Sequence, residues 1–200
     1  MRALRPLARV DGGAGPGRRF IGVRAEFKAG NMIEVRLSEA ERVEPRRIGL
    51  LRNSEAQAQG LKNQKVCDRS EDDNHVFGVL GEAAIQKLLG LTHLPLTVNT
   101  FQRVGDVAGL EIKTRSRHDM DLLLHFGKRY DRNFVLVTTE DQRIFRVHGW
   151  IWGHDAAQER FIQTYSKKGQ PPGPPAYFCP QKELNPINCV LDFPKLPVFD

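Results

Sequence analysis

The sequence predicts an α/β fold, with a central mixed β-sheet flanked by helices. One observation is the order of the hydrophobic patterns, in which helical repeats of three to four residues alternate with several strand-like runs. The other is size. A chain of 200 residues, 40% of them hydrophobic, can bury one core but is too short for two domains of ordinary size.

The first predicted elements follow Met32. Alternating apolar residues from Met32 predict a short half-buried strand. Ser38 followed by Glu41 has the spacing of a capping box, so a helix should begin there. Pro45 suits the first turn of a new helix better than a helix interior, which predicts a second helix. The apolar face of that second helix would carry Ile48, Leu51 and Ala58.

Residues 61–74 are polar and predict a loop, and residues 75–89 predict a helix that ends at Gly90. Apolar residues recur every three to four positions along that helix, at Phe77, Leu80, Ala84 and Leu88. The remaining predicted elements are strands at 97–107, 110–116, 134–139 and 144–152, and a short helix around 120–126.

The two ends of the chain differ from the domain of residues 32–165. Residues 1–31 combine arginine with glycine without a sustained period, which predicts disorder. Either translation begins at Met32 and this leader has no function, or the leader is a basic arm that grips phosphate. Eight of the 12 prolines lie between Pro171 and Pro197, so residues 166–200 should form an irregular C-terminal wrap.

Charge and cysteine content exclude several classes of protein. Seven basic and two acidic residues in the leader account for most of the net charge of +6, so the domain itself is nearly neutral. No apolar run approaches the roughly 18 residues of a membrane span, which predicts a cytoplasmic protein without a membrane partner. The cysteines are few, widely spaced and without a Cys-x-x-Cys pair, which argues against disulfides and structural zinc: Cys67, Cys179 and Cys189.

Two strand-like runs meet at a tight turn made by Ala108 and Gly109. If these two residues form the loop of a hairpin, Val107 lies opposite Leu110. That register determines which side chains share a face on either side of the turn.

In this register, Asp106 lies opposite Glu111, and the Cβ atoms of such partners are about 4.5 to 5.5 Å apart. The two carboxylates repel each other unless a hard cation such as Mg²⁺ binds between them. Lys113 lies two residues beyond Glu111 and therefore on the same face. A metal-activated water and a lysine that orients it or stabilises the pentavalent transition state are the means of phosphodiester hydrolysis.

Glu82 is a further candidate ligand, because it lies on the preceding predicted helix beside small residues that allow close approach. The alternative for Glu82 is an ordinary exposed helix glutamate. For Asp106, Glu111 and Lys113, the alternative is an exposed hairpin face with salt bridges.

The run from His75 to Trp152 resembles the PD-(D/E)xK nuclease superfamily, which has the restriction-endonuclease-like fold. Three motifs match in order: Gly-Glu82-Ala-Ala, Gly-Asp106 and Glu111-Ile112-Lys113. They are similar to the acidic residue of the family's first helix, its metal-binding aspartate and its E-x-K strand. Gly105 stands where the motif has proline. The chain looks closest to small stand-alone nucleases of phages and prophages.

The resemblance implies a Mg²⁺- or Mn²⁺-dependent nuclease that cuts nucleic acid, most readily DNA. It implies that Glu82, Asp106 and Glu111 bind the metal together with the backbone carbonyl of Ile112, and that Lys113 assists the attacking water. A homodimer is compatible, because cutting two strands commonly uses two copies. The rival interpretations are a non-catalytic nucleic-acid-binding or assembly module of the same fold, and a structural protein whose hairpin charges are ordinary ion pairs.

Two further groups of residues have an open interpretation. The continuation of the E-x-K strand could contact phosphate or could be a solvated strand end: Thr114, Arg115, Arg117 and His118. Alternating rings at His148, Trp150, Trp152 and His154 could stack on bases, although aromatic residues at strand spacing more often pack in a core. The cations around Tyr130 are explained equally well by a surface turn.

Overall fold

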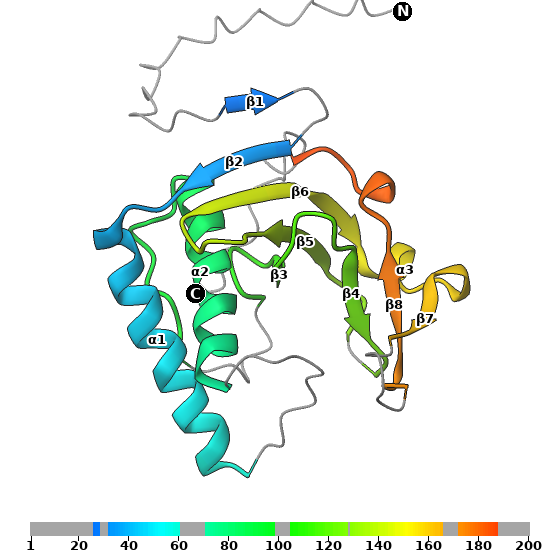
Figure 1. Ribbon diagram of the computed structural model, residues 1–200, viewed down its shortest axis with the longest axis horizontal. Helices are drawn as coiled ribbons and strands as arrows, with labels where there is room; N and C mark the ends of the chain where they lie inside the picture. Colours follow the sequence, from blue (N-terminus) through cyan, green and yellow to red (C-terminus); the bar gives the residue numbers. More distant parts are fainter. Residues whose placement is uncertain are drawn as a thin grey trace, which may run out of the picture.

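The computed structural model describes residues 26–28, 32–60, 71–98, 105–127, 129–165 and 172–187. The fold is mixed α/β, as predicted (Figure 1). The helices α1 (Glu39–Ala58) and α2 (Glu71–Leu88) lie on one side of a five-stranded sheet. A three-stranded sheet lies on the other side, so the two long helices cover one face of the large sheet.

The five-stranded sheet has the order β1-β2-β6-β5-β3 and is mixed. Only β3 and β5 run parallel, and the other neighbours are antiparallel. Its strands are β1 (Glu26–Lys28), β2 (Met32–Arg36), β3 (Glu111–Arg115), β5 (Asn133–Thr138) and β6 (Ile144–Trp152). Within the described residues, β3 is the terminal strand on its side of this sheet.

The smaller sheet has the order β4-β8-β7 and is antiparallel. Its strands are β4 (Leu122–His125), β7 (Ile162–Thr164) and β8 (Pro175–Cys179). The short helices α3 (Gly153–Ala156), η1 (Glu159–Phe161) and η2 (Gln181–Glu183) complete the described structure.

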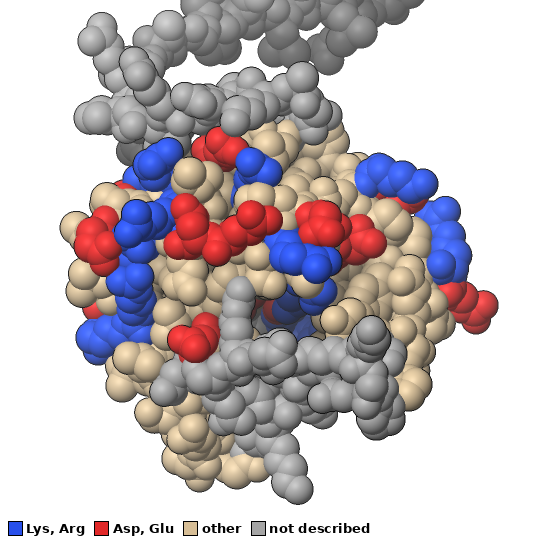
Figure 2. All heavy atoms as spheres, in the orientation of Figure 1, with Lys and Arg blue, Asp and Glu red and all other residues tan. Residues whose placement is uncertain are grey.

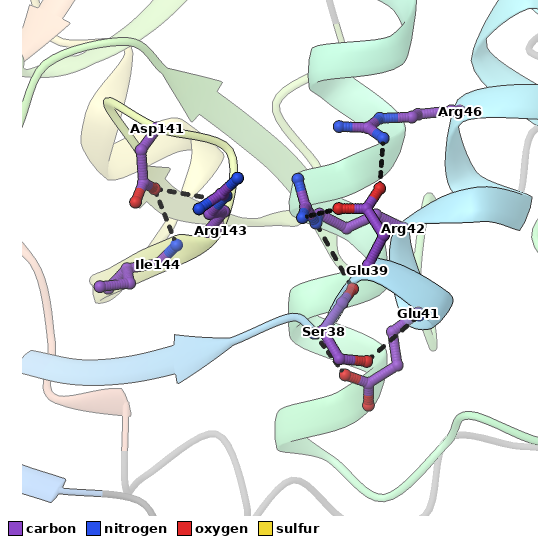
Figure 3. A network of polar contacts seen from close by, with 8 residues as sticks. All are labelled: Ser38, Glu39, Glu41, Arg42, Arg46, Asp141, Arg143 and Ile144. Carbon is purple, nitrogen blue, oxygen red and sulfur yellow. Dashed lines mark hydrogen bonds and ion pairs between the residues drawn. The ribbon is translucent and has the colours of Figure 1, made fainter.

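The capping box at the start of α1 is present as predicted. Ser38 Oγ accepts a hydrogen bond from the Glu41 backbone nitrogen, and the Glu41 carboxylate accepts one from Ser38. Figure 3 shows these contacts, together with Glu39 between Arg42 and Arg46. The capping bonds satisfy backbone N–H groups at the start of α1, and the pairs with Glu39 offset the charges of Arg42 and Arg46. Both stabilise a helix that has few apolar residues.

The predicted break at Pro45 is wrong, because α1 continues through it as one helix. An interior proline costs about 3 kcal/mol. Packing on α2 offsets this cost, since Pro45 and Ile48 are buried and a Cβ on Gly49 would lie 2.4 Å from the Val76 Cα. Leu51, which was expected on the packed face, is 40% exposed.

The helix predicted at 75–89 is α2, which begins earlier, at Glu71. It ends as predicted before Gly90, whose φ of 69° is the left-handed conformation that stops a helix. Its buried face includes Leu80 and Ala84, which pack with residues of the large sheet such as Val135 in one core.

The helix predicted around 120–126 is the strand β4 instead. Leu122 and Leu124 are buried while Leu123 between them is half-buried, which is the period of a strand. The β4 strand pairs with β8. The expectation of an irregular C-terminal segment was therefore also wrong for Pro175–Cys179, whose backbone donors and acceptors pair with both β4 and β7.

Several predictions lie wholly or partly outside the described residues. Of the leader, only residues 26–28 are described, and they form β1 rather than a disordered segment. Most of the strand predicted at 97–107 lies outside, and 105–106 are not strand. Cys67 and Cys189 also lie outside. No described helix is long and apolar enough to cross a membrane.

Candidate metal and phosphate site

The hairpin turn has the predicted register. Val107 and Leu110 form an antiparallel bridge, with hydrogen bonds of 2.8 and 3.2 Å between their backbones. Between them, Ala108 has a φ of 49° and Gly109 a φ of 78°. Two successive positive φ angles are typical of a type I′ turn, which joins adjacent antiparallel strands.

The backbone ladder does not continue beyond this bridge as a regular hairpin. The Ile112 nitrogen donates to Asp106 Oδ2 at 2.8 Å, so a side chain takes the place of a backbone partner. A Cβ on Gly105 would lie 2.6 Å from the Gly109 carbonyl carbon, so the chain folds tightly over its own turn. A hydrogen bond from the Ile112 amide, rather than strand pairing with Glu111, therefore holds Asp106 at the start of β3.

Glu111 and Lys113 lie together on β3. Their side chains form an ion pair of 3.4 Å, and Glu111 also pairs closely with Arg132. The Lys113 ammonium lies 5.5 Å from the ring centroid of Phe134 on the neighbouring strand. Lys113 is 36% exposed, which leaves it accessible to a ligand.

Glu82 is buried, so the alternative of an exposed helix glutamate was wrong. It is 4% exposed and accepts two hydrogen bonds from Arg52, of 2.5 and 2.8 Å. Arg52 Nε donates to the carbonyl of Thr97. A Cβ on Gly81 would lie 1.9 Å from Thr114 Oγ1, so only glycine allows α2 to approach β3 this closely.

The charges of the four predicted residues act on one another. Burial and then the charge of Asp106 raise the pKa of Glu82 to about 7, against the opposing effects of Arg52 and Lys113. Burial and the charge of Glu111 raise the pKa of Asp106, while Lys113 and the Ile112 amide oppose the rise. Asp106 is exposed as a whole residue, but protein atoms surround its carboxylate. This burial of the carboxylate is the main reason that the pKa of Asp106 is raised.

The sequence-predicted site residues Glu82, Asp106, Glu111 and Lys113 are thus brought together from α2, the turn and β3; we call them the acidic cluster. As the side chains stand, no three His, Cys, Asp or Glu residues of the described ranges are grouped so that they could hold a metal ion. Arg52 holds Glu82 and Arg132 holds Glu111. Sequence reasoning missed both arginines, because each is distant in sequence from its carboxylate.

The four residues predicted to contact nucleic acid do not form one surface. Thr114 packs against Gly81 and Arg115 is half-buried. Arg117 is exposed and pairs with Asp119 at 3.1 Å. His118 is half-buried, and its Nδ1 lies 2.8 Å from the buried hydroxyl of Thr138.

A polar chain that the sequence did not predict joins His118 to His148. The Thr138 hydroxyl lies 2.7 Å from His148 Nε2, so it bridges the two imidazoles. Gln181 Nε2 donates to the carbonyls of His118 and Met120 at 2.7 and 2.9 Å. Burial, followed by the charges of His118 and Arg146, lowers the pKa of His148 to about 4. His148 is therefore a neutral structural residue.

Acidic and basic side chains are interspersed on the face shown in Figure 2 rather than gathered in one basic patch. Lysine or arginine atoms also lie in a recess near the centre of this face, close to where Figure 1 places β3.

Comparisons of the chain with protein-family models, with curated proteins and with solved structures found no match.

Proposed function

We propose that this protein is a metal-dependent nuclease that hydrolyses phosphodiester bonds, with DNA as the substrate. The observation that carries the proposal is the convergence of Glu82, Asp106, Glu111 and Lys113 into one electrostatically coupled cluster. If these residues formed only unrelated salt bridges, there would be no reason for a helix, a turn and a strand to bring their charges to one place.

The donor atoms suit a hard cation such as Mg²⁺ or Mn²⁺. They are the carboxylates of Glu82, Asp106 and Glu111 and the backbone carbonyl of Ile112, all of them oxygen. Burial is the main cause of the raised pKa values of Glu82 and Asp106, and repulsion between neighbouring carboxylates adds to it; a bound cation would relieve this repulsion, which supports the fit. When bound there, a divalent cation polarises phosphate and lowers the pKa of a bound water.

Three residues of the cluster then have roles that follow from their positions. Asp106 is held at the start of β3 by the Ile112 amide, which presets one ligand. Glu111 has to turn from Arg132 to become a second. Lys113 carries its charge beside both carboxylates, where it can orient a water or offset charge on a pentavalent phosphorus.

We also assign the domain to the restriction-endonuclease-like fold. What supports this assignment is a mixed sheet whose terminal described strand bears Glu111-Ile112-Lys113, covered by a helix bearing Glu82. The order of these motifs along the chain is the order on which the resemblance depends.

The test is cleavage of linear, circular and branched DNA by the purified protein with Mg²⁺, with Mn²⁺ or with EDTA. Asp106→Ala and Lys113→Ala should each reduce metal-dependent cleavage by roughly 10²-fold or more, the size of effect seen when one group that stabilises a transition state is removed. Glu44→Gln and Lys182→Ala are matched controls, because both residues are exposed and lie outside the cluster. Cleavage that survives in both cluster variants would overturn the proposal.

A second candidate function is a non-catalytic nucleic-acid-binding module. The observation that favours it is that Arg52 and Arg132 already supply counter-charge to two of the three carboxylates. Titration with Mn²⁺ separates the two, since a ligand that binds the native state raises the melting temperature. A protein that binds DNA, shows no Mn²⁺-dependent shift and does not cut would be the module.

A further inference from the structure

Five aromatic side chains form a continuous row at the end of the molecule remote from α1, near α3 and β8 (Figure 1). Neighbouring ring centroids lie 4.7, 5.8, 6.4 and 6.2 Å apart in the order Phe126, Tyr177, Tyr130, His154 and Trp152. We call this set the aromatic row. Only Trp152 and His154 of it belonged to the alternating rings noted in the sequence. Their companions there lie elsewhere, since Trp150 packs against the core and His148 bonds to Thr138.

The row is built by close packing between separate segments. A Cβ on Gly153 would lie 2.4 Å from the Tyr130 carbonyl oxygen, so glycine brings the start of α3 directly against the segment before β5. The Tyr130 hydroxyl donates to the carbonyl of His125 at 3.0 Å, which ties that segment to β4. Rings from four segments are thereby held in fixed relative positions.

Both ends of the row are open to solvent. Phe126 is 43% exposed and Trp152 is 38% exposed, and His154 is also exposed. The contacts of Tyr177 and Tyr130 are edge-to-face, with interplanar angles of 72° to 88°. Both tyrosines are half-buried and pack against the core shared with the small sheet, so the exposed rings of the row are those at its two ends. Solvent-exposed aromatic groups of this kind are typical of a binding surface.

The Trp152 end of the row adjoins the acidic cluster. Trp152 pairs with Asn133, the Gly153 nitrogen donates to the Arg132 carbonyl at 2.8 Å, and Arg132 pairs with Glu111. Two strand spacings separate β6 from β3, which is about 10 Å. Arg132 and Lys113, both paired with Glu111, therefore lie beyond the Trp152 end of the row, and the rings extend away from them. A nucleic-acid strand has the matching parts, which are a charged backbone and flat bases.

We infer that the aromatic row binds the unpaired bases of a single nucleic-acid strand that leads into the acidic cluster. The inference rests on the proposed function and adds to it a substrate class: single-stranded, flapped or frayed nucleic acid rather than intact duplex. Bases within a duplex already stack on one another, whereas unpaired bases can stack on protein rings for about 1 to 3 kcal/mol each.

The test is the affinity of the full-length protein for a fluorescent oligo(dT), an oligo(rU) and a matched duplex, in EDTA so that no cleavage occurs. Trp152→Ala should weaken binding of the single strands by roughly 5- to 100-fold and leave duplex binding unchanged. Trp152→Phe should restore most of the affinity, because a ring remains. Leu50→Ala is the matched control, since Leu50 is 47% exposed on α1, away from the row. Melting temperatures confirm that each variant is folded.

The outcomes separate this inference from the proposed function. Equal single-strand affinity in wild type, Trp152→Ala and Phe126→Ala would overturn the inference even where Asp106→Ala abolishes cleavage. Loss of single-strand binding in Trp152→Ala that Trp152→Phe restores would support it even in a protein that never cuts. Loss on the oligo(rU) alone would assign the row to RNA, and loss on both strands to unpaired bases of either kind.

Discussion

Glu82 shows how one buried carboxylate can combine stability with metal chemistry. Removing a charge from water is costly unless it is paired and hydrogen-bonded, and the fork of Arg52 supplies both. Burial and Asp106 nevertheless raise its pKa to about 7, so protons compete for this site near neutral pH. A cation that binds the cluster has to displace such a proton.

Metal binding should therefore strengthen with pH. Below the pKa of about 7, Glu82 carries a proton that a cation must release, and above it the cation competes for the carboxylate with Arg52 alone. The Mn²⁺-induced rise in melting temperature should grow from about pH 6 to pH 8, as for any site whose ligands must first lose protons. Glu82→Gln should reduce this dependence and Glu44→Gln should leave it intact. A shift of equal size across the range would contradict the role of Glu82.

His148 should make the protein sensitive to acid. Its pKa falls from 6.5 to about 4 on folding, so between these values the unfolded chain binds a proton that the folded chain does not. This stability is therefore present above pH 6.5 and is lost as the pH falls toward 4. Urea denaturation at a series of pH values should show that decline, and His148→Gln should flatten it. His93→Gln, a change at an exposed histidine, should follow the wild type.

At the scale of the element, the turn at residues 107–110 positions the acidic cluster. Two positive φ angles reverse the chain, so that the Asp106 carboxylate can accept a hydrogen bond from the amide of Ile112, beyond Leu110 of the bridge. The turn depends on the residue types that tolerate this backbone, and Gly109 is the more tolerant of its two central residues.

Gly109→Ala should lower the free energy of unfolding by about 1 to 2 kcal/mol, because a Cβ is strained at a φ of 78°. It should also reduce the Mn²⁺-induced shift, since Asp106 and Glu111 lie on the two sides of the turn. Gly78→Ala is the control, because its Cβ would meet open space within α2 and should stabilise by up to about 1 kcal/mol. Urea denaturation of both variants measures the difference. Equal stabilities would show that the turn carries no strain.

Elements with a strong local signal could be predicted from the sequence. The turn, the capping box and the strand at Ile144–Trp152 depend on neighbours within a few positions, and each has the predicted form. The strand β4 could not be predicted in this way, because its partner in β8 lies more than 50 residues away. Three leucines in succession fit a helix or a strand until that partner is known.

The candidate site divides in the same way. The residues of the acidic cluster could be proposed because turn register and strand period relate Asp106, Glu111 and Lys113 locally. Arg52 and Arg132 could not, because contacts across the fold bring them to the carboxylates. The aromatic row likewise depends on distant contacts, because Phe126 directly follows β4 and Tyr177 lies on β8, and these two strands are far apart in sequence.

At the scale of the whole molecule, one strand serves two cores. Along β5, Val135 faces the core beneath α2, and Leu136 faces the core shared with the small sheet. Loss of packing in one core would expose one face of β5 and weaken the strand on which the other core also depends. The described domain should therefore unfold in one transition.

Leu80→Ala and Leu124→Ala, one in each core, should each lower the free energy of unfolding by about 2 to 5 kcal/mol. Far-ultraviolet circular dichroism and tryptophan fluorescence should give coincident urea transitions in both variants. Leu50→Ala, at an exposed position on α1, should change stability by less than about 0.5 kcal/mol. Separate transitions for the two probes would show that the cores unfold independently.

The crossover between the parallel strands β3 and β5 passes through β4, whose partner β8 comes near the end of the described chain. During translation, β3, with Glu111 and Lys113, leaves the ribosome some 60 residues before Pro175–Cys179 can pair with β4. The strand β4, which lies between β3 and β5 in sequence, thus lacks its partner strand until then. A nascent chain would thus carry the acidic cluster, together with Arg52 and Arg132 that pair with it, before the small sheet against the other face of β5 could form.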